Sequence, residues 1–203
     1  MHVPQNRPAS GRDLLVLVAG IAAVGAPALH LLSDILEWFG GFSPAQLWLN
    51  YVAFVPMCWL LLALHFVRRP RSRAADRAGI AGALLYGAAF TYFAFTHLPP
   101  SPNACRTTPP SGIASARFYT VHGGLMVAGG LLFSGAALGA RTLPRGAVAL
   151  FLAGIVTNLV LAFLPAPEIL QTAGSTLRNL GLIAIGVAIF AAPPGRDGRS
   201  SGA

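Results

Sequence analysis

The chain has 203 residues, of which 55% are hydrophobic and only 10% are charged, and its mean hydropathy is +0.64. A soluble domain carries roughly a quarter charged residues, so this composition excludes an ordinary soluble domain and indicates a protein whose solvent is lipid. The net charge of +8 comes from arginine alone, and the arginines lie beside the ends of apolar stretches, which argues against a nucleic-acid-binding surface.

Six apolar stretches follow one another along the chain, each close to the roughly 20 residues that a helix needs to cross a bilayer. The sixth stretch ends near Ala192 and begins either at Glu168 or near Gly174. The pattern predicts an all-α protein, a polytopic transmembrane bundle of six helices. The first five predicted spans are Leu14–Leu36, Leu47–Val67, Ala78–Phe95, Phe118–Ala140 and Gly146–Leu164.

The remaining segments are too short to bury a core of their own. We therefore expect a cytoplasmic tail over 1–13, a six-helix transmembrane domain over 14–192 and a disordered cytoplasmic tail over 193–203. The first apolar stretch also resembles a secretory signal, with Ala26-Pro27-Ala28 as its cleavage site. Because the apolar run continues past this triplet to Leu36, we expect the first helix to be retained.

Arginine predicts which side of the membrane each connection faces. When the connections are placed on alternate sides, eleven arginines fall on the side of the two termini and two, Arg106 and Arg117, fall on the other. Positively charged connections stay in the cytoplasm, so both termini are predicted to be cytoplasmic and the membrane to be the plasma (inner) membrane.

Polar residues gather in the outer half of the predicted bundle. His30, Ser33, Asp34 and Glu37 lie in the first span at spacings of three and four, which places them on one helical face. Polar groups in hydrocarbon are costly and face protein, water or a ligand. Every other span also contributes to the outer half: Asn50, His97, His122, Asn158 and Arg178.

Three interpretations of this outer group remain open. Asp34 or Glu37 can pair with Arg178 as a structural bridge between the first and last helices. The group can instead be a pocket for a polar lipid head or a small ligand, or a zinc site, since zinc accepts imidazole and carboxylate ligands. The ligand-binding candidates are His30, Ser33, Asp34, Glu37, Asn50, His122 and Arg178, and the candidate zinc ligands are His30, His97 and His122.

Glycines in the fourth span predict close helix packing. Gly135 and Gly139 have the small-xxx-small spacing that lets helix backbones approach in lipid. Gly129 and Gly130 keep the same helix slender. We therefore expect this helix to be central in the bundle.

Taken in order, the outer polar residues form a pattern. Ser33-Asp34 near the end of the first span is followed by Asn50 in Leu-Trp-Leu-Asn-Tyr, and a proline-rich connection precedes His122. The sequence Gly-Ser-Thr-Leu-Arg then ends at Arg178. This pattern resembles the prokaryotic six-helix membrane family catalogued as domain of unknown function 998, over about residues 14–192. The resemblance implies that these five polar positions are characteristic of the family, and it implies no reaction.

The resemblance is incomplete after the third span. Members of that family carry Phe-Pro followed by an acidic residue there, whereas this chain reads His97-Leu98-Pro99-Pro100. A role for that acid therefore cannot be transferred.

The sequence predicts a multi-pass membrane protein that binds a lipid or small amphiphile in its outer polar group, with membrane lipids as partners. One alternative is a metal-dependent intramembrane hydrolase that acts on a lipid ester or amide, with zinc as its cofactor. A second alternative is a small transporter, although the two halves show no internal repeat. Whether the chain is an enzyme stays open, because it contains no paired-histidine motif such as HExxH.

Overall fold

The computed structural model describes residues 11–41, 43–96, 112–164 and 168–191. Within these ranges the chain forms six α-helices and no β-strand, which confirms the all-α prediction. The sixth helix begins at Glu168, the earlier of its two predicted starts. The helices are α1 (Gly11–Gly40), α2 (Pro44–Val67), α3 (Arg73–Thr96), α4 (Gly112–Ala140), α5 (Arg145–Leu161) and α6 (Glu168–Ala191).

Several helices extend beyond the apolar stretches that predict them. The first helix begins at Gly11, so residues 11–13 of the predicted N-terminal tail are helical. The second begins at Pro44, where Ser43 caps it by accepting a hydrogen bond from the Gln46 N–H at 3.2 Å. Proline suits the first helical turn because the turn does not use its missing N–H.

Length and apolar composition make four described helices candidates to cross a membrane. They are α1, α2, the part of α4 from Thr120 to Ala140 and the part of α6 from Thr172 to Ala191. The fifth helix is apolar but has 17 residues. At 1.5 Å per residue it is about 26 Å long, slightly less than the roughly 30 Å of a hydrocarbon core.

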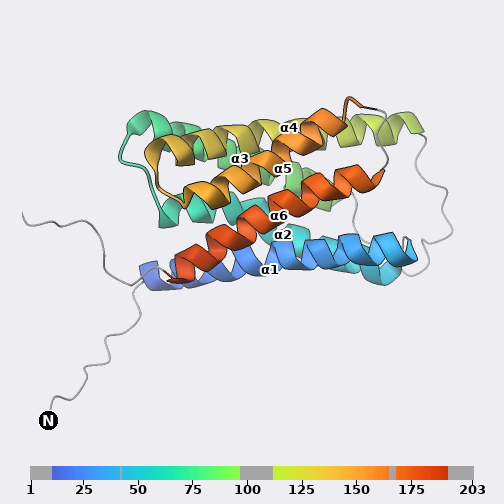
Figure 1. Ribbon diagram of the computed structural model, residues 1–203, viewed down its shortest axis with the longest axis horizontal. Helices are drawn as coiled ribbons and strands as arrows, with labels where there is room; N and C mark the ends of the chain where they lie inside the picture. The colour runs from blue at the N-terminus through green and yellow to red at the C-terminus, as the bar shows by residue number, and fades with distance from the viewer. Residues whose placement is uncertain (1–10, 42, 97–111, 165–167, 192–203) are drawn as a thin grey trace, which may run out of the picture.

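Each helix packs against the next one in the chain, and α6 returns to pack against α1. The six helices therefore run up and down in a closed ring (Figure 1). The ends of the described chain, Gly11 and Ala191, lie at the same end of the bundle, where the blue start of α1 meets the red end of α6. The expected central position of α4 is wrong, because α4 is one member of the ring with α3 and α5 as its main neighbours.

Aromatic rings fill the inside of the ring. Phe54 of α2 packs edge-on against Phe90 of α3, with 4.9 Å between the ring centroids. Tyr86 of α3 meets Phe151 of α5 at 5.8 Å, and Phe151 meets Phe133 of α4 at 6.5 Å. These edge-to-face contacts join four helices through side chains that are almost completely buried.

Glycine allows the closest helix contacts. A Cβ at Gly129 of α4 would lie 2.7 Å from the carbonyl oxygen of Gly82 in α3, and a Cβ at Gly82 would lie 2.7 Å from the Gly129 carbonyl. Gly135 and Gly139 have no atom within 4 Å of that position and face outward. Their predicted role in packing is therefore wrong within this chain, because the packed face of α4 is the one that carries Gly129.

We expect Gly129→Val to destabilise the protein by about 1–3 kcal/mol, because the added side chain would push α3 and α4 apart. Gly135→Val is the matched control, since it makes the same change on the open face of α4. Thermal unfolding of both purified variants in detergent measures the difference. Equal midpoints for the two variants would contradict the assigned packing face.

Candidate functional site

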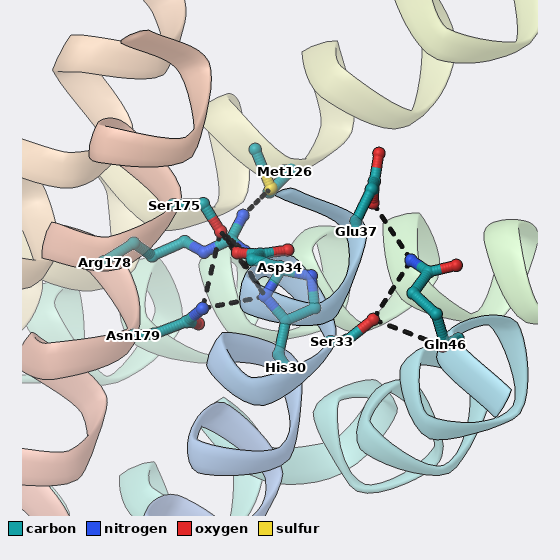
Figure 2. A network of polar contacts seen from close by, with 9 residues as sticks. All are labelled: His30, Ser33, Asp34, Glu37, Gln46, Met126, Ser175, Arg178 and Asn179. Carbon is teal, nitrogen blue, oxygen red and sulfur yellow. Dashed lines mark hydrogen bonds and ion pairs between the residues drawn. The ribbon is translucent and has the colours of Figure 1, made fainter. Parts of the chain in front are cut away.

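A network of polar side chains joins α1 to α6 inside the bundle (Figure 2). At its centre the Ser175 hydroxyl donates a hydrogen bond to the Asp34 carboxylate at 3.0 Å. The same oxygen lies 3.3 Å from Nη2 of Arg178, which donates to it, and 3.4 Å from the amide nitrogen of Asn179. Ser175, Arg178 and Asn179 share one face of α6 because they are spaced by three and four residues.

His30 completes the network from α1. Its Nδ1 lies 2.7 Å from the amide nitrogen of Asn179 and 3.7 Å from the Asp34 carboxylate. An amide nitrogen only donates hydrogen bonds, so Nδ1 is the acceptor and the ring proton is on Nε2. The imidazole also stacks on Phe54, with 5.0 Å between the centroids, which fixes its orientation.

The Arg178 guanidinium is buried, with 4% of the residue exposed, and its hydrogen bonding is incomplete. Nη1 donates to the Met126 sulfur at 2.8 Å, and Nε has no hydrogen-bond partner in the described chain. The cation also lies 5.9 Å from the Phe90 ring centroid, a cation–π distance. A thioether is a weak acceptor, so this buried cation keeps an unmet capacity to donate.

Asp34 and Arg178 form no direct ion pair in the described structure, because Ser175 stands between them. Glu37 lies elsewhere and accepts a hydrogen bond from the Gln46 side chain of α2 at 2.9 Å. The predicted bridge between the first and last helices therefore exists through a hydroxyl rather than as a salt bridge.

A second set of hydrogen bonds joins α1 to α2 on the other side of α1 (Figure 2). The Ser33 hydroxyl donates a hydrogen bond to the backbone oxygen of Gln46 at 3.2 Å and accepts one from the Gln46 side-chain amide, also at 3.2 Å. Ser33 and Glu37 thus hold the α1–α2 turn and do not join the Ser175 network. Asn50, another predicted site residue, has a buried side-chain oxygen with no hydrogen-bond partner in the described chain.

His122 ties α4 to α3. Its Nδ1 lies 2.8 Å from the Ala89 backbone oxygen, and its ring packs against Phe90 and Phe93 at 5.5 and 5.2 Å. His122 therefore packs against Phe90, the same ring that lies 5.9 Å from the Arg178 guanidinium.

The structure leaves the predicted zinc site untested. No three His, Cys, Asp or Glu side chains lie close enough to hold a metal ion among the residues that the structure describes. His97, one of the three predicted ligands, lies outside those residues. The site at His30, His97 and His122 stays a prediction.

Four residues of these networks were not predicted from the sequence. Ser175 and Asn179 could have been found, because they share the helical face of Arg178. Gln46 and Met126 carry no such signal, since an amide at a helix start and a methionine in an apolar helix are ordinary there. Only the packing of α2 and α4 places them beside charged groups.

The opposite end of the bundle carries a smaller polar cluster. Asp76 at the start of α3 accepts two hydrogen bonds from Arg69, at 2.8 and 2.7 Å, and one from Nε2 of His65 at 2.9 Å. His65 is buried with 4% exposed, and its ring lies against Gly79 where a Cβ would collide. This cluster pins the end of α2 to the start of α3.

No protein-family model, curated protein or solved structure matches this chain.

We expect Ser175→Ala to lower the free energy of unfolding by about 1–2 kcal/mol, because Asp34, Arg178 and Asn179 lose the same hydroxyl as a hydrogen-bond partner. Ser134→Ala is the matched control. The Ser134 hydroxyl is buried but has no hydrogen-bond partner in the described chain, so its removal is expected to be nearly neutral. Thermal unfolding in detergent compares the two, and an equal loss for both would argue against the hub role of Ser175.

We expect the Asp76 cluster to weaken in acid. The hydrogen bonds from Arg69 and then from His65 hold the pKa of the Asp76 carboxyl well below its usual range. A lowered carboxyl pKa stabilises the fold above the ordinary value of about 4, and this contribution is lost as the pH falls below it. The unfolding midpoints of the wild type and Asp76→Asn should therefore differ most at neutral pH, and the difference should shrink progressively as the pH falls below about 4. A constant difference would contradict the assignment.

Proposed function

We propose that this protein crosses the plasma membrane six times, with both termini in the cytoplasm, and binds the polar head of a lipid or small amphiphile in its outer half. The four long apolar helices support membrane insertion. Large exposed hydrophobic side chains occur on every helix, as contact with lipid requires and contact with water disfavours. They include Ile21, Val55, Leu84, Leu132, Val160 and Val187.

The observation that carries the ligand proposal is the incomplete bonding of Arg178. Burying a cation without full pairing is costly, and a native protein rarely leaves such a group without a partner that it meets in use. The thioether of Met126 occupies Nη1, and Nε is unpaired in the described chain. An anionic oxygen of a ligand would be a much stronger acceptor for both nitrogens.

The surrounding groups define the rest of the ligand head. The side-chain oxygen of Asn179 is buried and accepts no hydrogen bond in the described chain. One carboxylate oxygen of Asp34 accepts the hydrogen bond from Ser175. The Asp34 side chain is 17% exposed, so a hydrogen-bond donor of a ligand can reach it. The ligand therefore combines an acidic oxygen for Arg178 with an amino or hydroxyl donor for Asp34 and Asn179.

Phosphatidylethanolamine has both groups, a phosphate and an ammonium, whereas phosphatidylcholine has the phosphate without an N–H donor. We therefore expect the purified protein to retain phosphatidylethanolamine in preference to phosphatidylcholine. Arg178→Gln should lose most of this binding, and Asp34→Asn should lose the preference between the two lipids. Native mass spectrometry with each lipid added to the detergent-purified protein measures both effects.

Met126→Leu keeps the experiment informative if Arg178→Gln fails to fold. Leucine has similar volume and no acceptor, so it removes the competitor for Nη1. Lipid binding that is unchanged or tighter supports the proposal. Binding that is lost in Met126→Leu, or unchanged in a folded Arg178→Gln, would contradict it.

The sidedness has its own test. Cys105 lies outside the described residues, and the arginine pattern predicts that it faces the cell exterior. A membrane-impermeant thiol reagent should therefore label Cys105 in intact cells, and labelling only after permeabilisation would reverse the topology. The resemblance to domain of unknown function 998 assigns no activity and stays a prediction.

A further inference from the structure

The end of the bundle opposite the Ser175 network carries an excess of positive charge. The α2–α3 and α4–α5 connections, together with the starts of α3 and α5, bring seven arginines there, whereas Asp76 is the only acidic residue between Glu37 and Glu168. Seven positive charges and one negative charge leave +6 on this set, and Arg12 and Asp13 at the start of α1 cancel each other. The arginines are Arg68, Arg69, Arg71, Arg73, Arg77, Arg141 and Arg145.

The two connections lie side by side. A small cavity of about 10 Å³ is lined by His65 at the end of α2, by Arg68 from the first connection, and by Thr142 and Leu143 from the second. The arginines of both connections therefore belong to one surface, which we name the basic end.

Asp76, the one acidic residue near these arginines, already has hydrogen-bond partners. Arg69 and His65 donate three hydrogen bonds to the Asp76 carboxylate, so this negative charge stabilises the connection and does not pair with the other arginines. The other six arginines are exposed and form no ion pair with a described residue. Arg69 thus has a structural role, and its six neighbours carry uncompensated charge.

The position of some of these arginines adds to the imbalance. Arg73 begins α3 and Arg145 begins α5, where the helix dipole is positive and a cation is unfavourable. At α5 the capping residue Pro144 makes no side-chain hydrogen bond. Anions placed over this surface would relieve both the mutual repulsion and the conflict with the helix dipoles.

We infer that the basic end binds the headgroups of anionic phospholipids in the leaflet around it. Phe66 is 46% exposed and precedes Arg68 by two residues, so an apolar surface for acyl chains adjoins the charge. A lipid satisfies both the charge and the apolar surface, whereas free phosphate satisfies the charge alone. The inference rests on the proposed membrane insertion and is independent of ligand binding at Arg178.

Native mass spectrometry of the full chain in neutral detergent, titrated with phosphatidylglycerol at low and high salt, tests the inference. We expect Arg71→Gln/Arg73→Gln to weaken phosphatidylglycerol binding about ten-fold or more, since each arginine near anionic lipid contributes about five-fold. Arg141→Gln/Arg145→Gln should weaken it similarly. Binding to the wild type should decline as salt rises.

Arg106→Gln/Arg117→Gln is the charge-matched control, because it removes two arginines that the arginine pattern places at the opposite end. It should bind phosphatidylglycerol as the wild type does. Phosphatidylglycerol also has a phosphate and hydroxyl donors, so each titration is repeated in the Arg178→Gln background, where the effect of the basic-end variants should persist. Phosphatidylethanolamine, which is net neutral, should bind all the basic-end and control variants equally, so a failure at the basic end is distinguishable from a failure at Arg178. Equal weakening in the control, wild-type affinity in both basic-end variants, or full competition by sodium phosphate at the lipid's own concentration would overturn the inference.

Discussion

The contact between α1 and α6 closes the ring of helices, and the polar part of that contact depends on one hydroxyl group. Ser175 donates to Asp34 and accepts from Arg178 and Asn179, so an acid and a base on different helices share one small neutral group. A direct ion pair would have satisfied the Arg178 guanidinium more fully. The indirect arrangement instead leaves the buried Arg178 guanidinium with N–H groups that lack strong acceptors, and this property makes the site a candidate for ligand binding.

The rest of the bundle keeps that arrangement in place. His30 is fixed by stacking on Phe54, which in turn packs against Phe90 beneath the Arg178 guanidinium. The close approach of Gly87 in α3 to the backbone carbonyl of Cys58 in α2 brings the helices of Phe54 and Phe90 near enough for these rings to meet. Apolar packing therefore positions the polar groups, because in lipid polar contacts alone add little to helix association.

The two ends of the bundle carry charge in different ways. At one end the charged groups of Asp34 and Arg178 lie within the bundle and are linked through the Ser175 hydroxyl. At the other, Asp76 holds only Arg69 and His65, and the remaining arginines stay on the surface. Buried groups suit recognition of a single head with defined donors and acceptors, whereas exposed arginines suit a layer of anionic headgroups.

The sequence by itself determined the helical class, the approximate positions of the six helices and the grouping of His30, Asp34 and Arg178 in one part of the bundle, because apolar length and helical spacing are local properties. It could not show that the Ser175 hydroxyl lies between Asp34 and Arg178 or that Glu37 accepts a hydrogen bond from Gln46. Nor could it show that Gly129 rather than Gly135 packs against the next helix. These outcomes depend on how each helix is rotated about its axis. Only the tertiary structure decides that rotation, since it follows from the simultaneous fit of all six helices around the ring.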